Sequence, residues 1–171
     1  MQDQHEEDTN LVEIWLRKDP ARWVAGAMAG IFAGLLAGAF AMAVAKMLGY
    51  EMWFPIKLAA LPFLGGRATE FGINAGLITG LIVMESLCMV LGMVYAHFTG
   101  LNSLPLLLGA GFTWGCFSWI FINNLFTPAF PDISAANLSK APGFFVCMVF
   151  GLSLTSVAFF DRMVRGGNSS R

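Results

Sequence analysis

One carboxylate stands in the middle of a strongly apolar stretch. Glu85 follows Leu-Ile-Val-Met and precedes Ser-Leu-Cys-Met-Val, and an ionisable side chain at membrane depth is costly and marks a candidate functional site. Its role is either functional or structural. A functional Glu85 is a proton or ion site or a polar contact to another subunit, whereas a structural one is a protonated carboxyl that is hydrogen-bonded to a neighbouring carbonyl or hydroxyl such as Thr113 or Ser118. Asn74 is the other intramembrane polar residue that we expect near the stripe of Glu85.

Few other side chains offer chemistry. The two histidines, His5 and His97, do not provide the pair of ligands at membrane depth that a b-type haem needs. Cys88, Cys116 and Cys147 lie singly in apolar stretches without a C-x-x-C pair, which is typical of small packing residues. No serine-hydrolase, zinc-protease, P-loop or dinucleotide fingerprint occurs in the sequence. We therefore expect no metal, no cofactor, no catalytic residue and no enzyme activity of the chain's own.

The composition places the chain in the membrane class. Of its 171 residues 57% are hydrophobic and only 12% are charged, and the mean hydropathy is +0.67, whereas soluble domains carry about 25% charged residues. The formal net charge of -1 excludes a nucleic-acid partner, because phosphate binding needs a clustered basic surface. The sequence therefore predicts an integral membrane protein embedded in a lipid bilayer.

Four apolar stretches are long enough to cross a bilayer, which takes about 20 helical residues. We expect spans at about 23–48, 71–96, 104–123 and 142–160, within a transmembrane domain of residues 20–161. Asp19-Pro20 is a start signal for the first span, because Pro at the first helical position follows a capping residue. Thr69 is a candidate cap for the second. The predicted fold is an all-α integral membrane protein with four transmembrane helices and short interfacial helices.

The segments outside the spans are short. Residues 1–19 form a polar tail, in which residues 10–18 predict an interfacial amphipathic helix, and residues 162–171 form a second tail. The segment 53–66 is too short to span and carries two prolines, which favours an interfacial position. Lys and Arg are slightly more numerous on the side of the tails, so both termini are expected to be cytoplasmic. That side holds Arg17, Lys18, Arg22, Arg162, Arg165 and Arg171, and the other holds Lys46, Lys57, Arg67 and Lys140.

The chain has a weak internal sequence repeat. The first span leads to Trp53-Phe54-Pro55 and the third leads to Phe126-Thr127-Pro128. Two helical hairpins in parallel orientation could descend from an old duplication, as in some transporter folds.

Glycine recurs every fourth residue in the predicted spans. Such spacing lets the backbones of two helices approach closely, which is how helices associate in lipid. Intramolecular packing could satisfy one of the runs, and contacts with other chains are expected to use the rest. The predicted helix-packing residues are Gly26, Gly30, Gly34 and Gly38 in the first span, Gly72, Gly76 and Gly80 in the second, Gly111 and Gly115 in the third, and Gly151 in the fourth.

Two functions fit these features. The first is a non-catalytic accessory or structural subunit of a larger membrane complex, such as a respiratory or photosynthetic electron-transfer complex in a bacterial inner membrane. The alternative is a small oligomeric transporter or channel with Glu85 as its proton or ion site. The aromatic third span, with Phe112, Phe117 and Phe121 among its residues, offers a face for lipid tails, a quinone or another subunit.

Overall fold

The computed structural model describes residues 19–99, 104–129 and 140–168. Within these ranges the chain is helical, without a strand, and four helices are long and apolar enough to cross a membrane. The predicted all-α membrane fold is therefore confirmed. The predicted interfacial helix at 10–18 lies outside the described residues. The helices are α2 (Pro20–Met47), α3 (Phe54–Leu58), α4 (Leu61–Leu64), η1 (Gly65–Thr69), α5 (Ala75–Phe98), α6 (Leu104–Phe121), η2 (Ile122–Phe126), α7 (Thr127–Ala129), α9 (Lys140–Ser153), η3 (Leu154–Ser156) and α10 (Val157–Asn168).

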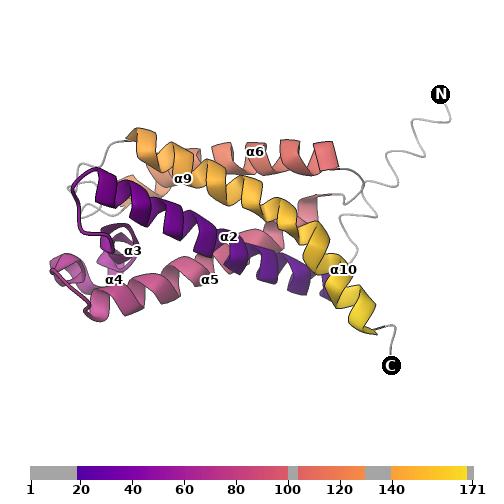
Figure 1. Cartoon of the computed structure of the whole chain (residues 1–171), viewed down its shortest axis with the longest axis horizontal. Helices are drawn as coiled ribbons and strands as arrows, with labels where there is room; N and C mark the ends of the chain where they lie inside the picture. The colour runs from indigo at the N-terminus through magenta and orange to yellow at the C-terminus, as the bar shows by residue number, and fades with distance from the viewer. Residues whose placement is uncertain (1–18, 100–103, 130–139, 169–171) are drawn as a thin grey trace.

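The helices follow one another in antiparallel order, so α2 begins at the end of the bundle where α10 ends. We call this the terminal end, and the opposite end, beside α3 and α4, the α3 end (Figure 1). In Figure 1, α6 and α5 lie on opposite sides of α2 and α9. The main neighbour of α5 is α2, the main neighbour of α6 is α9, and α2 packs against both α9 and α10. The four spans therefore form a row, α5–α2–α9/α10–α6, whose two outer helices separate toward the α3 end.

Helices α2 and α5 form the first hairpin through facing glycines. A Cβ added at Gly26 would lie 2.7 Å from the Gly92 carbonyl oxygen, and one added at Gly92 would lie 2.6 Å from the Gly30 Cα. Ala25, Ala29 and other alanines beside these glycines are buried in a core cluster that also contains Leu154 and Val157 of the last span. Close backbone approach supplies the packing here, since lipid gives apolar helices no hydrophobic reason to associate.

The second hairpin repeats this device. A Cβ at Gly111 would lie 2.6 Å from the Gly151 carbonyl oxygen, and one at Gly115 would lie 2.8 Å from the Cys147 carbonyl oxygen. Near the terminal end the Tyr95 hydroxyl donates a buried hydrogen bond of 3.1 Å to the Leu107 carbonyl, which joins α5 to the start of α6. The two hairpins thus use the same packing chemistry. Their origin by duplication stays a prediction.

The start of the second span differs from the prediction. Helix α5 begins at Ala75, and Asn74 caps it by accepting a hydrogen bond of 3.2 Å from the Leu77 amide. Gly72 precedes the helix with a φ of +89°, and a Cβ there would meet nothing within 4 Å. The assignments of Gly72 as a helix-packing residue and of Thr69 as the cap are therefore wrong. The depth of Asn74 in the bilayer stays a prediction. A positive φ suits glycine and stops a right-handed helix, so the chain turns at Gly72.

Gly76 and Gly80 pack, but not against another span. A Cβ at Gly76 would collide with the Ala68 carbonyl oxygen, and one at Gly80 would lie 2.9 Å from the Ile56 carbonyl carbon. The backbones of α3 and η1 therefore pack directly against the backbone of α5. The segment expected at 53–66 does form short helices.

The last span extends further than its prediction of 142–160. Helix α9 continues through one 3₁₀ turn, η3, into α10, which ends at Asn168. Residues 162–168, expected to belong to a tail, are thus helical. The start of α2 agrees with the prediction, with Asp19 at the N-cap and Pro20 in the first turn.

Candidate functional site

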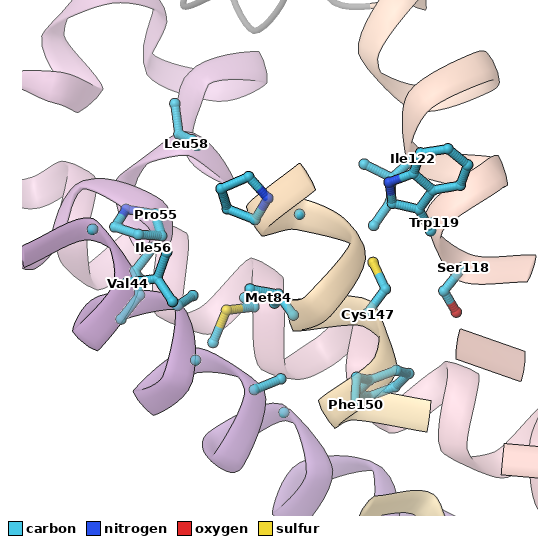
Figure 2. Close-up of a pocket in the computed structure, with 18 of the residues that line it drawn as sticks. Val44, Pro55, Ile56, Leu58, Met84, Ser118, Trp119, Ile122, Cys147 and Phe150 are labelled. Atoms are coloured by element: carbon cyan, nitrogen blue, oxygen red, sulfur yellow. The ribbon is translucent and has the colours of Figure 1, made fainter. Parts of the chain in front are cut away.

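A cavity of about 480 Å³ lies among the four spans. It reaches from the α3 end, at Leu48 and Asn123, to the middle of the bundle, at Gly34 and Phe150. Figure 2 shows Ser118, Trp119 and Ile122 of the α6 segment on one side of α9 and Val44, Pro55 and Ile56 of α2 and α3 on the other. The lining also includes Ala37, Gly38, Ala41, Ala45, Tyr50, Phe54, Leu58, Met84, Leu87, Cys88, Leu91, Pro142, Gly143, Val146 and Cys147. It is therefore almost wholly apolar.

One hydroxyl in this lining has no partner. Ser118 is only 4% exposed, and its Oγ makes no hydrogen bond to the described residues. A buried polar group without a partner costs free energy. The Ser118 Oγ is itself enclosed by protein, so it does not present a hydrogen-bonding group to the cavity.

The carboxyl of Glu85 lies against α2 at Gly34. Its Oε2 would be 2.9 Å from a Cβ at Gly34, so the absence of a side chain there makes the room for the carboxyl. Both carboxyl oxygens are buried and make no hydrogen bond within the described part of the chain. The proposed partners are not brought to it, since Thr113 donates to the Gly109 carbonyl at 2.9 Å and the Ser118 hydroxyl is itself unpartnered. Glu85 is thus an intramembrane carboxyl beside the cavity wall, without a visible partner.

The aromatic residues of α6 divide into two sets. Trp114 packs edge-on against Tyr95 with ring centroids 6.0 Å apart, and Trp119 packs edge-on against Phe144 at 5.6 Å. Phe112 and Phe117 are instead 54% and 51% exposed. The tryptophans therefore tie α6 to its neighbours, and the phenylalanines face away from the bundle.

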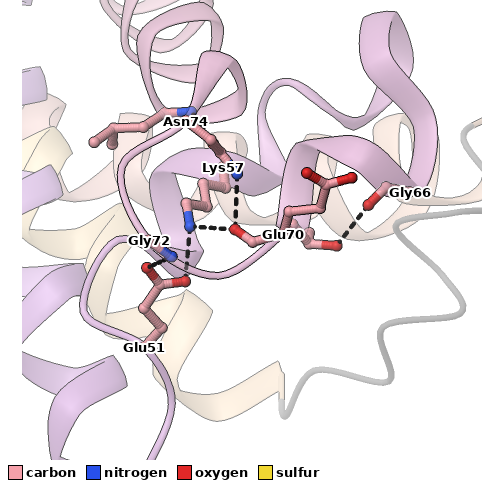
Figure 3. A network of polar contacts seen from close by, with 8 residues as sticks. Glu51, Lys57, Gly66, Glu70, Gly72 and Asn74 are labelled. Carbon is pink, nitrogen blue, oxygen red and sulfur yellow. Dashed lines mark hydrogen bonds and ion pairs between the residues drawn. The ribbon is translucent and has the colours of Figure 1, made fainter.

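A buried lysine fixes the segment that covers the cavity at the α3 end. The Lys57 side chain is 0% exposed, and its Nζ lies 2.7 Å from Glu51 Oε2 and donates to the Glu70 carbonyl at 2.7 Å. Glu51 Oε1 accepts from the Gly72 amide at 2.9 Å (Figure 3). The hydrogen bond from Lys57 holds the pKa of the Glu51 carboxyl below its usual value. The sequence placed Lys57 among the flanking charges and gave no sign that Glu51 would pair with it.

A second charged cluster joins α2 to α10 at the terminal end. The Arg165 guanidinium lies 2.6 Å from Asp19 Oδ2 and 2.8 Å from Asp161 Oδ2. The hydrogen bond from Arg165 lowers the pKa of Asp19. Arg22 donates from Nε to the Ala96 carbonyl at 2.6 Å. These contacts fasten the ends of three helices, and the Asp19 side chain is used here instead of capping α2.

The remaining candidate residues are scattered. His97 lies at the end of α5, with its ring 6.3 Å from that of Trp23. In the described ranges, no three His, Cys, Asp or Glu side chains gather as a metal site would require. Gly92 is the packing residue that the sequence analysis missed, although it continues the four-residue spacing of Gly76 and Gly80.

The chain matches no family model, no curated protein and no solved structure in the comparisons with known proteins. Its function is therefore inferred from these residues and their geometry.

Proposed function

We propose that the chain is a non-catalytic accessory subunit of a larger multi-subunit membrane complex. It would lie in a bacterial inner membrane with both termini in the cytoplasm, and a respiratory or photosynthetic electron-transfer complex is the kind of assembly it would serve. The observation that supports the proposal is the position of α6, whose main contact is with α9 alone.

Helix α6 presents a continuous outward face. Phe117, Ile120 and Phe121 lie within about 100° of one another around the helix axis, and they are 51%, 51% and 37% exposed. Large rigid rings provide contact area at low conformational cost, which suits a protein interface as well as lipid. A partner helix packed on this face would cover the side of α6 that its contacts with α9 and with Tyr95 of α5 leave exposed.

The glycine runs do not provide a surface for another subunit. Nine of the ten predicted glycines place their backbone against atoms of this chain, and Gly72 faces open space. The proposed interface is therefore one outward face of α6, which we define by Phe117, Ile120 and Phe121.

A paired substitution tests this interface. Phe117→Ala with Phe121→Ala should release co-purifying membrane proteins from the affinity-tagged chain in mild detergent, as quantified by mass spectrometry. The matched control is Phe145→Ala with Phe159→Ala, because these phenylalanines are 58% and 61% exposed on α9 and α10. Equal recovery of partners by both pairs would contradict an α6 interface.

The distribution of basic residues supports the proposal that both termini lie in the cytoplasm. Arg22, Arg162 and Arg165 cluster at the terminal end, where α2 begins and α10 ends. An excess of basic residues favours the cytoplasmic side. Cysteine labelling from outside intact cells should therefore reach a Cys introduced at Arg67 and spare one introduced at Arg162.

The second candidate is a small oligomeric transporter or channel, and the unpartnered carboxyl of Glu85 favours it. A buried protonated carboxyl reacts with hydrophobic carbodiimides, so Glu85 should be labelled by dicyclohexylcarbodiimide. Proton or cation flux into proteoliposomes of the purified chain should then be lost in Glu85→Gln and kept in Glu70→Gln, whose carboxyl lies on an exposed residue outside the spans. No flux from the unsubstituted chain would remove this candidate.

A further inference from the structure

The carboxyl of Glu85 is enclosed where α5 packs against α2. A Cβ added at Gly34 would lie 2.9 Å from Glu85 Oε2, 2.9 Å from the Cys88 Cβ and 3.0 Å from the Cys88 Sγ. Both carboxyl oxygens are buried, and neither has a hydrogen-bond partner among the described residues. We call this place the Gly34 contact and define it by Gly34, Glu85 and Cys88. The carboxyl fits there because its neighbour on α2 is the bare backbone of a glycine.

The Gly34 contact lies at the boundary between two kinds of packing. Toward the terminal end the two backbones meet directly, since a Cβ at Gly30 would collide with the Cys88 carbonyl oxygen. Toward the α3 end a Cβ at Gly38 would approach only the Met84 side chain, whose Cε would be 3.1 Å away. The two helices are therefore held backbone to backbone on one side of the contact and through a flexible side chain on the other.

The described helices place no opposite charge near the Gly34 contact. On α2 the nearest charged residues are Arg22 and Lys46, each twelve residues from Gly34, which is about 18 Å along the helix. Lys57 of α3 is already engaged by Glu51 and by the Glu70 carbonyl. The remaining charged or titratable groups on α5 and on the elements packed against it are Arg67 of η1 and Cys88, Tyr95 and His97 of α5, and Cys147 of α9 lines the same cavity as Cys88. An ionised Glu85 would therefore have no counter-ion in the packed contact.

This environment couples the proton of Glu85 to the packing of the two helices. A carboxylate without a counter-ion or hydrogen bonds is strongly unfavourable in apolar surroundings, so a carboxyl there keeps its proton. An ionised Glu85 needs water or another polar group at its oxygens. Room for such a group at Gly34 requires that α2 moves away from α5.

We propose that the Gly34 contact is a proton-controlled contact, which is packed while Glu85 is protonated and separates when Glu85 is ionised. One proton leaves the carboxyl for the solvent at each separation. Low pH therefore favours the packed form, and the ratio of the separated to the packed form rises by up to about tenfold per pH unit. The proposal depends on neither candidate function, because it requires no partner on α6 and no ion flux.

Pulsed electron–electron distance measurements on the full-length chain in lipid nanodiscs test the proposal. Spin labels are attached to p-acetylphenylalanine at Leu35 of α2 and Ile82 of α5, which are 54% and 61% exposed, so that the native cysteines are kept. We expect a single short distance at pH 6 and a second, longer distance that grows by up to about tenfold per pH unit toward pH 9. A single unchanged distance over this whole pH range would overturn the proposal.

Two glutamine substitutions identify the group that titrates. Glutamine has nearly the size of a protonated glutamate and has no proton to lose in this pH range, so Glu85→Gln should keep the short distance at every pH. Glu70 is exposed and outside the spans, so Glu70→Gln should show the pH dependence of the unsubstituted chain. The same pH dependence in Glu85→Gln would overturn the proposal.

Two alanine substitutions on α2 provide a matched comparison of the packing. The new Cβ of Gly34→Ala would lie 2.9 Å from Glu85 Oε2, whereas that of Gly38→Ala would meet only the end of the flexible Met84 side chain. At pH 8 Gly34→Ala should raise the ratio of separated to packed form about fivefold or more, and Gly38→Ala should leave it unchanged. Equal ratios in the two variants would contradict the placement of the contact at Gly34. If Gly34→Ala does not fold, the comparison of Glu85→Gln with Glu70→Gln still decides the proposal.

Discussion

Removal of the Glu51 carboxylate should expose how much of the α3 end depends on one buried ion pair. The substitution Glu51→Gln keeps the size of the side chain and the acceptor for the Gly72 amide. It leaves the Lys57 ammonium, which is 0% exposed, with the Glu70 carbonyl as its remaining hydrogen-bond partner among the described residues. A buried charge that loses its counter-ion is strongly unfavourable.

The magnitude follows from the burial of the pair. Removing one partner of a fully buried ion pair costs about 3–5 kcal/mol. The Glu51 side chain keeps 15% exposure, so we expect the free energy of unfolding to fall by about 2–4 kcal/mol. Lys57→Met should cost less than Glu51→Gln, because an apolar side chain of similar length leaves no buried charge.

The assay is denaturant unfolding in mixed micelles, followed by tryptophan fluorescence and circular dichroism. Glu70→Gln is the matched control, because the Glu70 backbone carbonyl and not its carboxylate accepts from Lys57 (Figure 3), and it should change stability by less than about 0.5 kcal/mol. A loss below about 1 kcal/mol in Glu51→Gln, or an equal loss in the control, would refute the assignment of Lys57 as a buried charge held by Glu51.

The same pair predicts a pH dependence. The pKa of Glu51 is lowered in the folded protein by the hydrogen bond from Lys57, so the native state favours the carboxylate. Its contribution is complete above the unfolded pKa of about 4.3 and is lost as the pH falls through the lower folded value. The free energy of unfolding, measured from pH 6 to pH 3, should therefore fall with pH more steeply in the unsubstituted protein than in Glu51→Gln. Parallel pH profiles for the two proteins would contradict this prediction.

Three further substitutions test the packing and the terminal end. Gly92→Leu should prevent folding, because its side chain would overlap the backbone of α2, whereas Gly109→Leu should fold normally. Resistance to protease in detergent distinguishes the two variants. Tyr95→Phe should lower the free energy of unfolding by about 0.5–1.5 kcal/mol through loss of one buried hydrogen bond, and a change near zero would show that the bond is unimportant. Asp19→Asn should cost less than about 1 kcal/mol in the same unfolding assay, because the Arg165 side chain is 50% exposed and keeps a second carboxylate; a larger loss would contradict this.

The four spans could be predicted because length and hydropathy nearly decide them. A bilayer accepts only helices or closed barrels, so each long apolar stretch had one outcome. The start of α5 could not be placed in this way, because Phe71, Gly72 and Ile73 are as apolar as the helix that follows. The positive φ of Gly72 and the Asn74 cap set the first residue of α5, and a hydropathy pattern reports neither feature.

The glycine spacing predicted which helix surfaces pack closely but not which segment packs against each of them. A step of four residues advances about 40° around a helix, so Gly76 and Gly92 point about 160° apart. One apparent run therefore serves two neighbours, α3 with η1 at its start and α2 at its end. The cavity was also invisible in the sequence, since it depends on how far α5 and α6 separate, and its lining residues come from five segments of the chain.

The most direct test of the proposed function is the mass of the assembly that contains this chain. The affinity-tagged protein should be extracted from its own membranes directly into lipid nanodiscs and analysed by native mass spectrometry. The proposal predicts a complex with one or more different membrane proteins in fixed stoichiometry. An 18.5 kDa protomer alone, or only multiples of that mass, would contradict an accessory subunit, and multiples would favour the oligomeric transporter instead.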